Sequence, residues 1–183
     1  NHKHKLNRIS KSSVAHSTVI LNNKSASTFK KKNGQNILDN GLKSINKNII
    51  YEKNFWSIKS SHNGYLKEFG TIHERTLEFL PDLEKFLGKD RLIKKKNFRP
   101  TSFEIRFHLM PNSKVTKTQD NKTVLIELEN SGWKFYTNHG LVDIETGLYF
   151  GKKNYYSENQ NIFITGNTQI DEQLIEWEII KIK

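Results

Sequence analysis

Short stretches in which apolar and polar residues alternate recur along this chain. In the clearest of them, residues 103–109, every second residue is apolar, and Glu104, Arg106 and His108 stand between. Because successive side chains of a β-strand point to opposite faces of the sheet, this alternation predicts a strand with one buried face. The same criterion predicts strands at residues 12–21, 55–60, 65–69, 71–80, 114–118, 123–128, 133–137, 141–149, 161–165 and 174–182.

Turn-forming residues separate the predicted strands at short intervals. Asn63-Gly64 is one turn, residues 119–122 join two strands into a predicted hairpin, and residues 81–88 and 138–140 form further turns. No helical pattern longer than two turns is present. Many short strands without long helices are typical of an all-β sandwich or barrel. The side chains expected in the core include Phe103, Ile105, Phe107, Trp133 and Trp177.

Residues 22–48 differ from the rest of the chain because they are polar and basic with few apolar anchors, which predicts a long loop. Residues 1–48 carry a net charge of +9, out of +11 for the whole chain. A basic segment attracts polyanions such as nucleic acid, an anionic membrane or an acidic polysaccharide. The general abundance of Lys, Asn and Ile in this chain is the alternative cause of the charge. No nucleic-acid recognition motif or interleaved aromatic residues accompany the lysines, so a nucleic acid is not the expected partner.

Length and composition set further bounds. The 183 residues are enough for one domain with a sizeable core, so residues 1–183 are interpreted as a single domain. The chain contains no cysteine, which excludes disulfides, thiolate catalysis and cysteine zinc sites. No apolar run reaches the roughly 18 residues of a transmembrane helix. The chain begins at Asn1 rather than at a methionine, so it is interpreted as a fragment or a processed product. No signal-peptide pattern is visible at its start.

Two pairs of basic side chains occupy alternate positions of predicted strands. His73 and Arg75 form one pair and Arg106 and His108 the other, so the members of each pair share a face of the sheet. A face that carries guanidinium and imidazole groups can bind carboxylate or sulfate, because the guanidinium offers a fork of N–H donors. We therefore take these four residues as candidates for substrate binding. The alternative is that they lie on the solvated outer face of an antiparallel sheet and bind no ligand.

Six short motifs, in order along the chain, resemble those of one protein family. They are Ala15-His16-Ser17-Thr18, Ser61-His62-Asn63-Gly64-Tyr65, His73-Glu74-Arg75, Asp90-Arg91-Leu92, Arg106-Phe107-His108-Leu109-Met110-Pro111 and Gly132-Trp133-Lys134-Phe135. Their order and spacing are similar to those of the heparinase II/III-like proteins. Two positions depart from the family pattern: Asn63 stands where an aspartate is usual, which removes a charge, and Met110 replaces a histidine.

The resemblance implies a fold and a chemistry. The fold is an all-β, antiparallel two-sheet β-sandwich of the supersandwich type, which in the family follows an N-terminal (α/α) toroid that this sequence lacks. Family members are polysaccharide lyases, a class of carbon–oxygen lyases, that act on uronic-acid-containing anionic glycans such as heparin, heparan or alginate. In their β-elimination a base removes the C5 proton beside a neutralised carboxylate, and the 4-linked sugar leaves.

The same resemblance bears on activity, partners and location. The main acid/base of the family, a tyrosine, belongs to the toroid, so the isolated chain is expected to be inactive and to have the toroid as a partner. The periplasm or cell envelope is the implied location. The alternative function is that of a non-catalytic carbohydrate-binding or structural β-sandwich, which would also contact glycans without turning them over.

At His16 the local pattern and the resemblance disagree. A strand histidine that shares its face with Val14 and Thr18 has the pattern of a group satisfied within a core. The resemblance instead implies a place at the cleft, as a catalytic residue or as a ligand of a divalent metal, zinc or calcium, with further ligands from strands upstream of this chain. No HxxxH or HExxH pair is present, so any metal site has to be assembled from distant segments.

Overall fold

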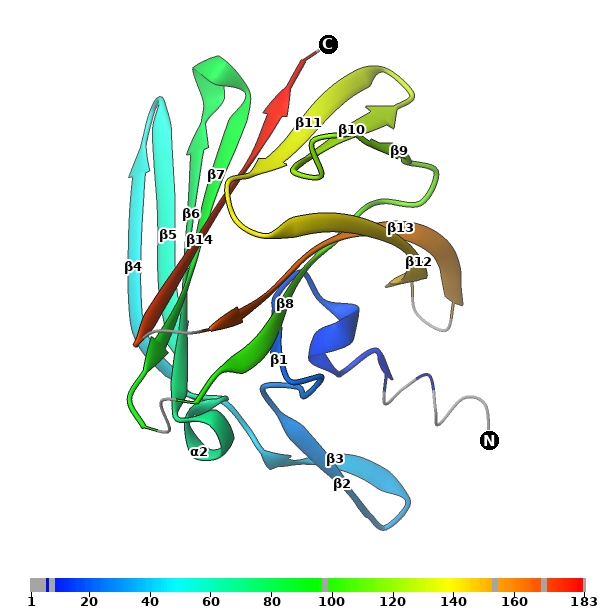
Figure 1. Cartoon of the computed structure of the whole chain (residues 1–183). Helices are drawn as coiled ribbons and strands as arrows, with labels where there is room; N and C mark the ends of the chain where they lie inside the picture. The colour runs from blue at the N-terminus through cyan, green and yellow to red at the C-terminus, as the bar shows by residue number, and fades with distance from the viewer. Residues whose placement is uncertain (1–5, 7–8, 97–98, 153–154, 169–170, 183) are drawn as a thin grey trace.

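The protein is a β-sandwich of two antiparallel sheets, seen in the computed structural model of Figure 1, as the sequence predicts. The structure describes residue 6 and residues 9–96, 99–152, 155–168 and 171–182. Within these ranges the helical elements are short: η1 (Ser13–Ala15), α2 (Leu66–Phe69) and η2 (Pro81–Leu83). None of the described helices is long and apolar enough to cross a membrane.

The two sheets differ in size. The small sheet has the strand order β1 (Val19–Leu21), β8 (Thr101–His108), β13 (Tyr155–Thr168) and β12 (Leu141–Lys152). The large sheet has the order β4 (Ser44–Glu52), β5 (Phe55–His62), β6 (Thr71–Leu80), β7 (Lys85–Lys94), β14 (Glu172–Lys181), β11 (Ser131–Thr137), β10 (Thr123–Leu128) and β9 (Lys114–Lys117). A separate hairpin is formed by β2 (Thr28–Lys32) and β3 (Gln35–Asn40).

The core lies between the two sheets and follows the alternation of the sequence. In β8 the side chains of Phe103, Ile105 and Phe107 are buried, whereas the residues between them are partly exposed. The ring of Phe107 packs against those of Phe135 and Trp177 in the large sheet, with centroid distances of 4.8 and 4.7 Å. Burial of each such side chain stabilises the fold by roughly 1.5–3 kcal/mol. The predicted burial of the β8 residues and of Trp177 is confirmed.

Trp133 departs from its predicted place in the core, because it is only partly buried. In the register of the large sheet it lies opposite Lys181, the last residue of β14, so the indole sits near the end of the strand pair. Its Nε1 donates a hydrogen bond to Ser131 Oγ at 3.0 Å. The ring therefore packs on the core with one side while its N–H is satisfied locally.

The strand predicted over residues 12–21 is wrong except for its last three residues, Val19–Leu21. Ser13–Ala15 forms a 3₁₀ turn instead. The Ser13 N–H donates to Ser25 Oγ at 3.0 Å, so a serine hydroxyl takes the place of a strand partner. Hydrogen bonds of this kind between side chains and backbone compete with strand pairing.

The long loop predicted over residues 22–48 is also wrong, since these residues contain the β2–β3 hairpin and the start of β4. Asn33 and Gly34 join the two hairpin strands with positive φ angles of 49° and 76°, as a type I′ turn requires. Every residue of β4 is exposed. A strand exposed on both faces has no apolar period, so alternation could not reveal β4. For the β2–β3 hairpin, the Asn33-Gly34 pair was the available signal in the sequence.

The segment after β5 was predicted to form a strand at residues 65–69, but Leu66–Phe69 forms one turn of helix. Gly70 ends the helix in the left-handed conformation, with a φ of 64°. The hydroxyl of Tyr65 donates to the Val19 carbonyl at 2.6 Å, which ties this turn to β1. Burial raises the pKa of Tyr65 to about 12, so the hydroxyl keeps its proton and this bond.

The turn predicted over residues 81–88 is confirmed only at Pro81–Leu83, because β7 already begins at Lys85. Gly88 lies inside β7, and a Cβ at this position would come within 2.1 Å of the Trp177 ring. This glycine therefore serves close packing within a strand, although in the sequence it resembles a turn signal.

Candidate functional site

A group of polar side chains gathers on the outer face of the small sheet, away from the core. His108 in β8 lies opposite Asn161 in β13, and Asn161 lies opposite Glu145 in β12. Arg106 precedes His108 by two residues and shares its face. His16 belongs to the segment that packs beside them before β1, to the right of β1 in Figure 1. These five residues are called the polar face below.

Arg106 is held between two carboxylates. Its Nε donates to Glu104 and its Nη1 to Glu145, and its guanidinium carbon lies 5.8 Å from the centroid of the Phe163 ring. Partial burial by itself would lower the pKa of Arg106, but the hydrogen bonds with both glutamates outweigh it and raise that pKa. Arg106 is therefore permanently charged, and its charge is largely compensated by its own neighbours.

His108 is held by the segment that precedes β1. Its Nε2 lies 2.9 Å from the Val14 carbonyl, and its backbone N–H donates to Ser17 Oγ at 2.9 Å. Since a carbonyl only accepts, Nε2 carries a proton, and in the neutral ring Nδ1 is then an acceptor. Desolvation by burial lowers the pKa of His108, and the charges of Arg106 and His16 act in the same direction. At neutral pH the ring is therefore uncharged.

His16 lies at the surface, just after the η1 turn and not in a strand. Its backbone N–H donates to the Ser13 carbonyl at 3.2 Å, and its own carbonyl accepts from Thr18 N at 2.9 Å. Within the described part of the chain its imidazole has no hydrogen-bond partner, and it is close enough to His108 for its charge to affect the pKa of that residue. The structure thus brings His16, Arg106 and His108 together, and the core position that the local pattern favoured for His16 is wrong.

The polar face continues over residues that the sequence analysis did not single out. Asn159 is 4% exposed, and its Nδ2 donates to the Leu109 carbonyl at 2.8 Å and to Asn161 Oδ1 at 3.0 Å. Among the described residues, its Oδ1 has no partner. A Cβ at Gly147 would lie 2.0 Å from Asn161 Nδ2, so only glycine leaves room for this amide pair. All of residues 157–161 are polar, so alternation gave no signal for this face.

His73 and Arg75 lie in the core and not on the polar face. They point to the inner side of the large sheet, where both bind Asp90, which is fully buried. His73 Nε2 lies 2.6 Å from Asp90 Oδ1, Arg75 Nε lies 2.7 Å from the same atom, and Trp177 Nε1 donates to Oδ2 at 2.9 Å. Burial alone would raise the pKa of Asp90, but the Arg75 charge and the His73 hydrogen bond hold it far below the usual range. These residues are called the buried cluster below.

His62 adds a second histidine to the buried cluster. Its Nε2 lies 3.1 Å from His73 Nδ1, and its Nδ1 accepts from Gly64 N–H at 3.2 Å. Desolvation, together with the nearby charges of His73 and Arg75, lowers the pKa of His62 from 6.5 to about 4. Both ring nitrogens of His73 therefore have partners inside the protein, so a glycan would have to displace one of them. Substrate binding by His73 and Arg75 stays a prediction.

Ser17 connects the buried cluster to the polar face. Its carbonyl accepts from Arg75 Nη1 at 2.5 Å, while its hydroxyl accepts from the backbone N–H of His108. Ser17, which follows His16, is therefore held both by Arg75 of the buried cluster and by His108 of the polar face. A change in the buried cluster is expected to reach His16 through this residue.

A hollow of about 280 Å³ lies at the other end of β8, lined by Asn22, Ser102, Glu104 and neighbouring residues. The Ser102 hydroxyl donates to Asn22 Oδ1 at 2.7 Å, so two of its polar groups satisfy each other. No residue of the polar face lines it. The titratable side chains of the polar face and the hollow therefore lie in different places. The polar face is the better candidate site because its titratable groups lie close together.

A metal ion needs more ligands than this chain assembles in the described residues. No group of three or more His, Cys, Asp or Glu side chains lies close enough together there to hold one. His16 and His108 supply two imidazoles, which suit zinc rather than calcium, a cation that prefers oxygen ligands. A metal at His16 therefore requires ligands from outside these residues.

The motifs and the sandwich agree with comparisons to known proteins. The family model described as Heparinase II/III-like, C-terminal, matches residues 1–178. The chain belongs to this heparinase II/III-like family. No curated protein matches the sequence.

Two solved heparinase structures show the same fold. A heparan sulfate lyase mutant from Pedobacter heparinus superposes with a TM-score of 0.76 at 13% identity, over 99% of this chain and 26% of the lyase. A heparinase III gene product gives a TM-score of 0.76 at 15% identity, over 100% of this chain and 26% of that protein. This chain therefore spans about a quarter of the length of these relatives.

The heparinase motifs have separate places in this fold. His62, His73, Arg75 and Asp90 come from three motifs and meet in the buried cluster, whereas the motifs of His16 and His108 meet on the polar face. Asn63, which replaces the usual aspartate, accepts from the Lys43 backbone N–H at 2.8 Å through Oδ1. An aspartate could accept the same bond, so the replacement removes a charge without removing this contact.

Proposed function

We propose that this chain is the sandwich portion of a polysaccharide lyase, and that its polar face contributes to a cleft against a preceding helical toroid. The substrate class is a uronic-acid-containing anionic glycan of the heparin, heparan or alginate kind. The observation that carries the proposal is the convergence of His16, Arg106 and His108, from segments far apart in a heparinase II/III-like chain, on one face.

The residues of the polar face suit β-elimination in supporting roles. Removal of a C5 proton needs a base and stabilisation of charge on the neighbouring carboxylate. His16 is exposed and is the residue that can reach a substrate, either as a hydrogen-bond donor or as a proton acceptor. His108 is neutral and is held against the segment of His16, and Arg106 holds the two glutamates in place through its hydrogen bonds. The main acid/base is expected in the toroid, so this chain alone does not turn over substrate.

Two further parts of the proposal follow from the family. A divalent metal at His16, zinc by the chemistry of imidazole, would polarise the uronate carboxylate, with its other ligands supplied from outside the described residues. The proposed location is the periplasm or cell envelope, where extracellular glycans are degraded.

A non-catalytic carbohydrate-binding sandwich is the second candidate function. One observation favours it: the charge of Arg106 is already neutralised by Glu104 and Glu145, which leaves little free positive charge for stabilising a developing anion. The two candidates differ in whether the whole protein produces unsaturated sugar.

The test is His16→Ala in the whole protein that carries this chain, with His139→Gln as a matched histidine control in the turn after β11. Turnover of uronate polymers, followed by the absorbance of the unsaturated product, is expected to fall at least about tenfold for His16→Ala. The control is expected to stay within about twofold, and thermal melts of both variants are expected to match the parent.

Turnover that persists unchanged in His16→Ala, or activity and fold lost together, would overturn the role of His16. A parent that binds uronate polymers but yields no unsaturated product would favour the carbohydrate-binding candidate. Turnover by residues 1–183 alone would show that the acid/base is not in the toroid.

A further inference from the structure

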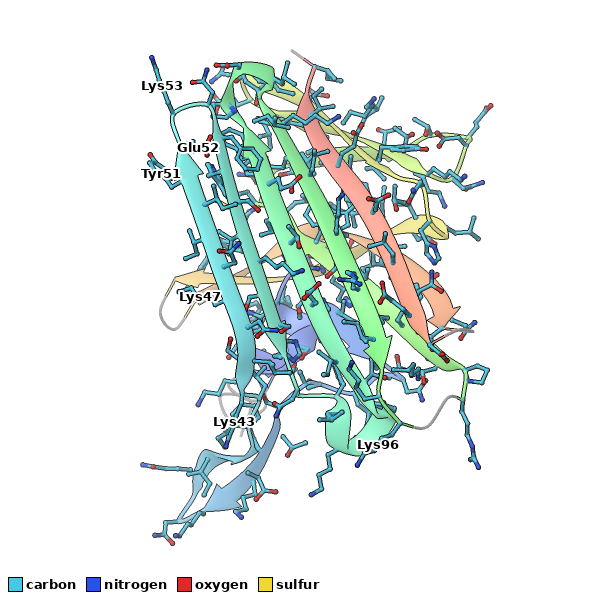
Figure 2. The ribbon with its side chains drawn as sticks, turned by 90° about the vertical axis from the view of Figure 1, so that its left-hand side faces the viewer. Lys43, Lys47, Tyr51, Glu52, Lys53 and Lys96 are labelled. Atoms are coloured by element: carbon cyan, nitrogen blue, oxygen red, sulfur yellow. The ribbon has the colours of Figure 1, made fainter. Side chains whose placement is uncertain are left out.

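Strand β4 forms an exposed edge of the large sheet. It pairs with β5 on one side, and on its other side no described strand pairs with it. Figure 2 shows Lys43, Lys47 and Lys53 along this edge, with Tyr51 between the last two. These four residues are called the basic edge. Long exposed edge strands are uncommon in proteins unless something covers them or charge protects them.

The lysines of the basic edge lack counter-charges. Within the described ranges none of the three makes an ion pair, whereas lysines of the neighbouring strands do: Lys59 lies 3.0 Å from Glu74 and Lys85 lies 2.6 Å from Glu178. The single acidic residue of residues 43–53 is Glu52, which alternates with Tyr51 and so points to the other face of β4. The basic edge therefore keeps an uncompensated positive charge, unlike Lys59 and Lys85 in the same sheet.

An aromatic and apolar surface accompanies this charge. Tyr51 is 84% exposed and lies opposite Trp56, and Ile49 is 53% exposed and lies opposite Ile58. Lys47 lies two residues before Ile49 and shares its face. Trp56 is supported from the next strand by the Phe79 ring at 5.7 Å. The small sheet does not cover this part of the large sheet, so a firm aromatic platform stands beside unpaired cations.

We propose that the basic edge is a second binding surface for an anionic glycan, separate from the polar face. Sulfate or carboxylate groups pair with the three lysines, and a sugar ring packs its apolar face on Tyr51. Lys47 lies in β4 and Lys53 follows its last residue, Glu52. From Lys47 to Glu52 the strand extends over roughly 17 Å, so the ligand is a chain of several sugars. This inference takes only the class of ligand, an anionic glycan, from the proposed function.

Two alternative roles of the basic edge, protection of the sheet edge and binding of nucleic acid, predict different binding properties. Lysines that merely prevent edge-to-edge pairing of strands would bind polyanions weakly and without dependence on Tyr51. A nucleic-acid surface would favour duplex DNA over a glycan of equal charge. The aromatic platform beside the lysines favours the glycan, because a duplex presents its phosphates and grooves and not a flat sugar face.

The experiment measures binding of a size-defined heparin oligosaccharide to the chain by titration calorimetry at several salt concentrations. The test variant is K43S/K47S/K53S, and the matched control is K11S/K95S/K122S, which removes three exposed lysines that also make no ion pair in the described residues. The test variant is expected to weaken binding at least about tenfold and to reduce the salt slope by about two, one counterion for most lysines lost. The control is expected to stay within about threefold of the parent.

A third variant, Tyr51→Ala, separates stacking from charge: it is expected to weaken binding about fivefold with an unchanged salt slope. Equal losses in the test and control variants, no effect of Tyr51→Ala, or no heparin binding by the parent would each overturn the proposal. So would tighter binding of duplex DNA that depends on the same residues. A loss of binding is assigned to the basic edge by its dependence on Lys43, Lys47, Lys53 and Tyr51, whereas failure of the polar face is measured by turnover in His16→Ala, so the two failures are distinguishable.

Discussion

The pairs His73-x-Arg75 and Arg106-x-His108 have the same chemistry and the same spacing, yet they have opposite surroundings. The first pair points into the core, where both side chains share the buried carboxylate of Asp90. The second pair points outward, where Arg106 binds Glu104 and Glu145 and His108 meets the segment of His16. The alternation of a strand places the two members of each pair on one face of the sheet. The residues that each pair contacts then determine whether that pair is structural or available to a ligand.

The difference lies in solvation. In the buried cluster, Asp90 has no access to water, so its charge is tolerable only because Arg75, His73 and Trp177 all contact it. On the polar face, Arg106 is as little exposed as Arg75, but its partners Glu104 and Glu145 are 22% and 36% exposed. Water can reach these two carboxylates, so the ion pairs of Arg106 contribute less to folding. The buried cluster is therefore a structural element that positions Ser17, and the polar face retains groups that are free to meet a ligand.

The largest expected effect is that of Asp90→Ala, which leaves Arg75 and His73 buried without their partner. The free energy of unfolding at pH 7 is expected to fall by about 3–5 kcal/mol, measured by urea denaturation. The control on the polar face is Glu145→Gln, expected to cost about 1 kcal/mol or less. Equal costs for the two variants would remove the distinction between the two regions.

A smaller effect concerns pH and His62. Its pKa is about 4 in the folded chain and 6.5 in the unfolded chain, so between these values the unfolded chain binds a proton that the folded chain does not. Stability therefore falls as pH drops from 6.5 to 4, by up to about 3 kcal/mol, and is regained above pH 6.5. His62→Gln is expected to flatten the melting temperature between pH 7 and pH 4.5.

His108 and His139 have lowered pKa values as well and act in the same direction, so part of the pH dependence is expected to remain in His62→Gln. His108→Gln is the control for an outer histidine and is expected to flatten the profile less. A profile that is unchanged in His62→Gln would contradict the assignment of a buried neutral histidine.

The smallest expected effect on stability is that of His16→Ala. The side chain is exposed and makes no hydrogen bond in the described residues, so the free energy of unfolding is expected to change by no more than about 0.5 kcal/mol. The urea midpoint measures this change. A loss of more than about 2 kcal/mol would place His16 with the buried cluster, as a structural residue.

Alternation predicted the strands that have one buried face, such as β6, β8 and β10, because burial on one side imposes a period of two. It failed where burial is absent or local bonds intervene. β4 is exposed throughout and carries no period, and the segment before β1 uses serine hydroxyls in place of strand partners. Of the candidate site, His16, Arg106 and His108 could be named in advance, but Glu145 and Asn161 could not.

The sequence by itself determined the family, the all-β class and the pairing of basic side chains on common faces. These properties depend on residue order and on the two-residue period of a strand, which are local. Only the tertiary structure decided which pair is buried, since Asp90 and Trp177 come from distant strands and their approach to Arg75 depends on how the sheets pack. It also decided that β4 is an open edge, because the strand order of a sheet depends on contacts between residues far apart in the chain.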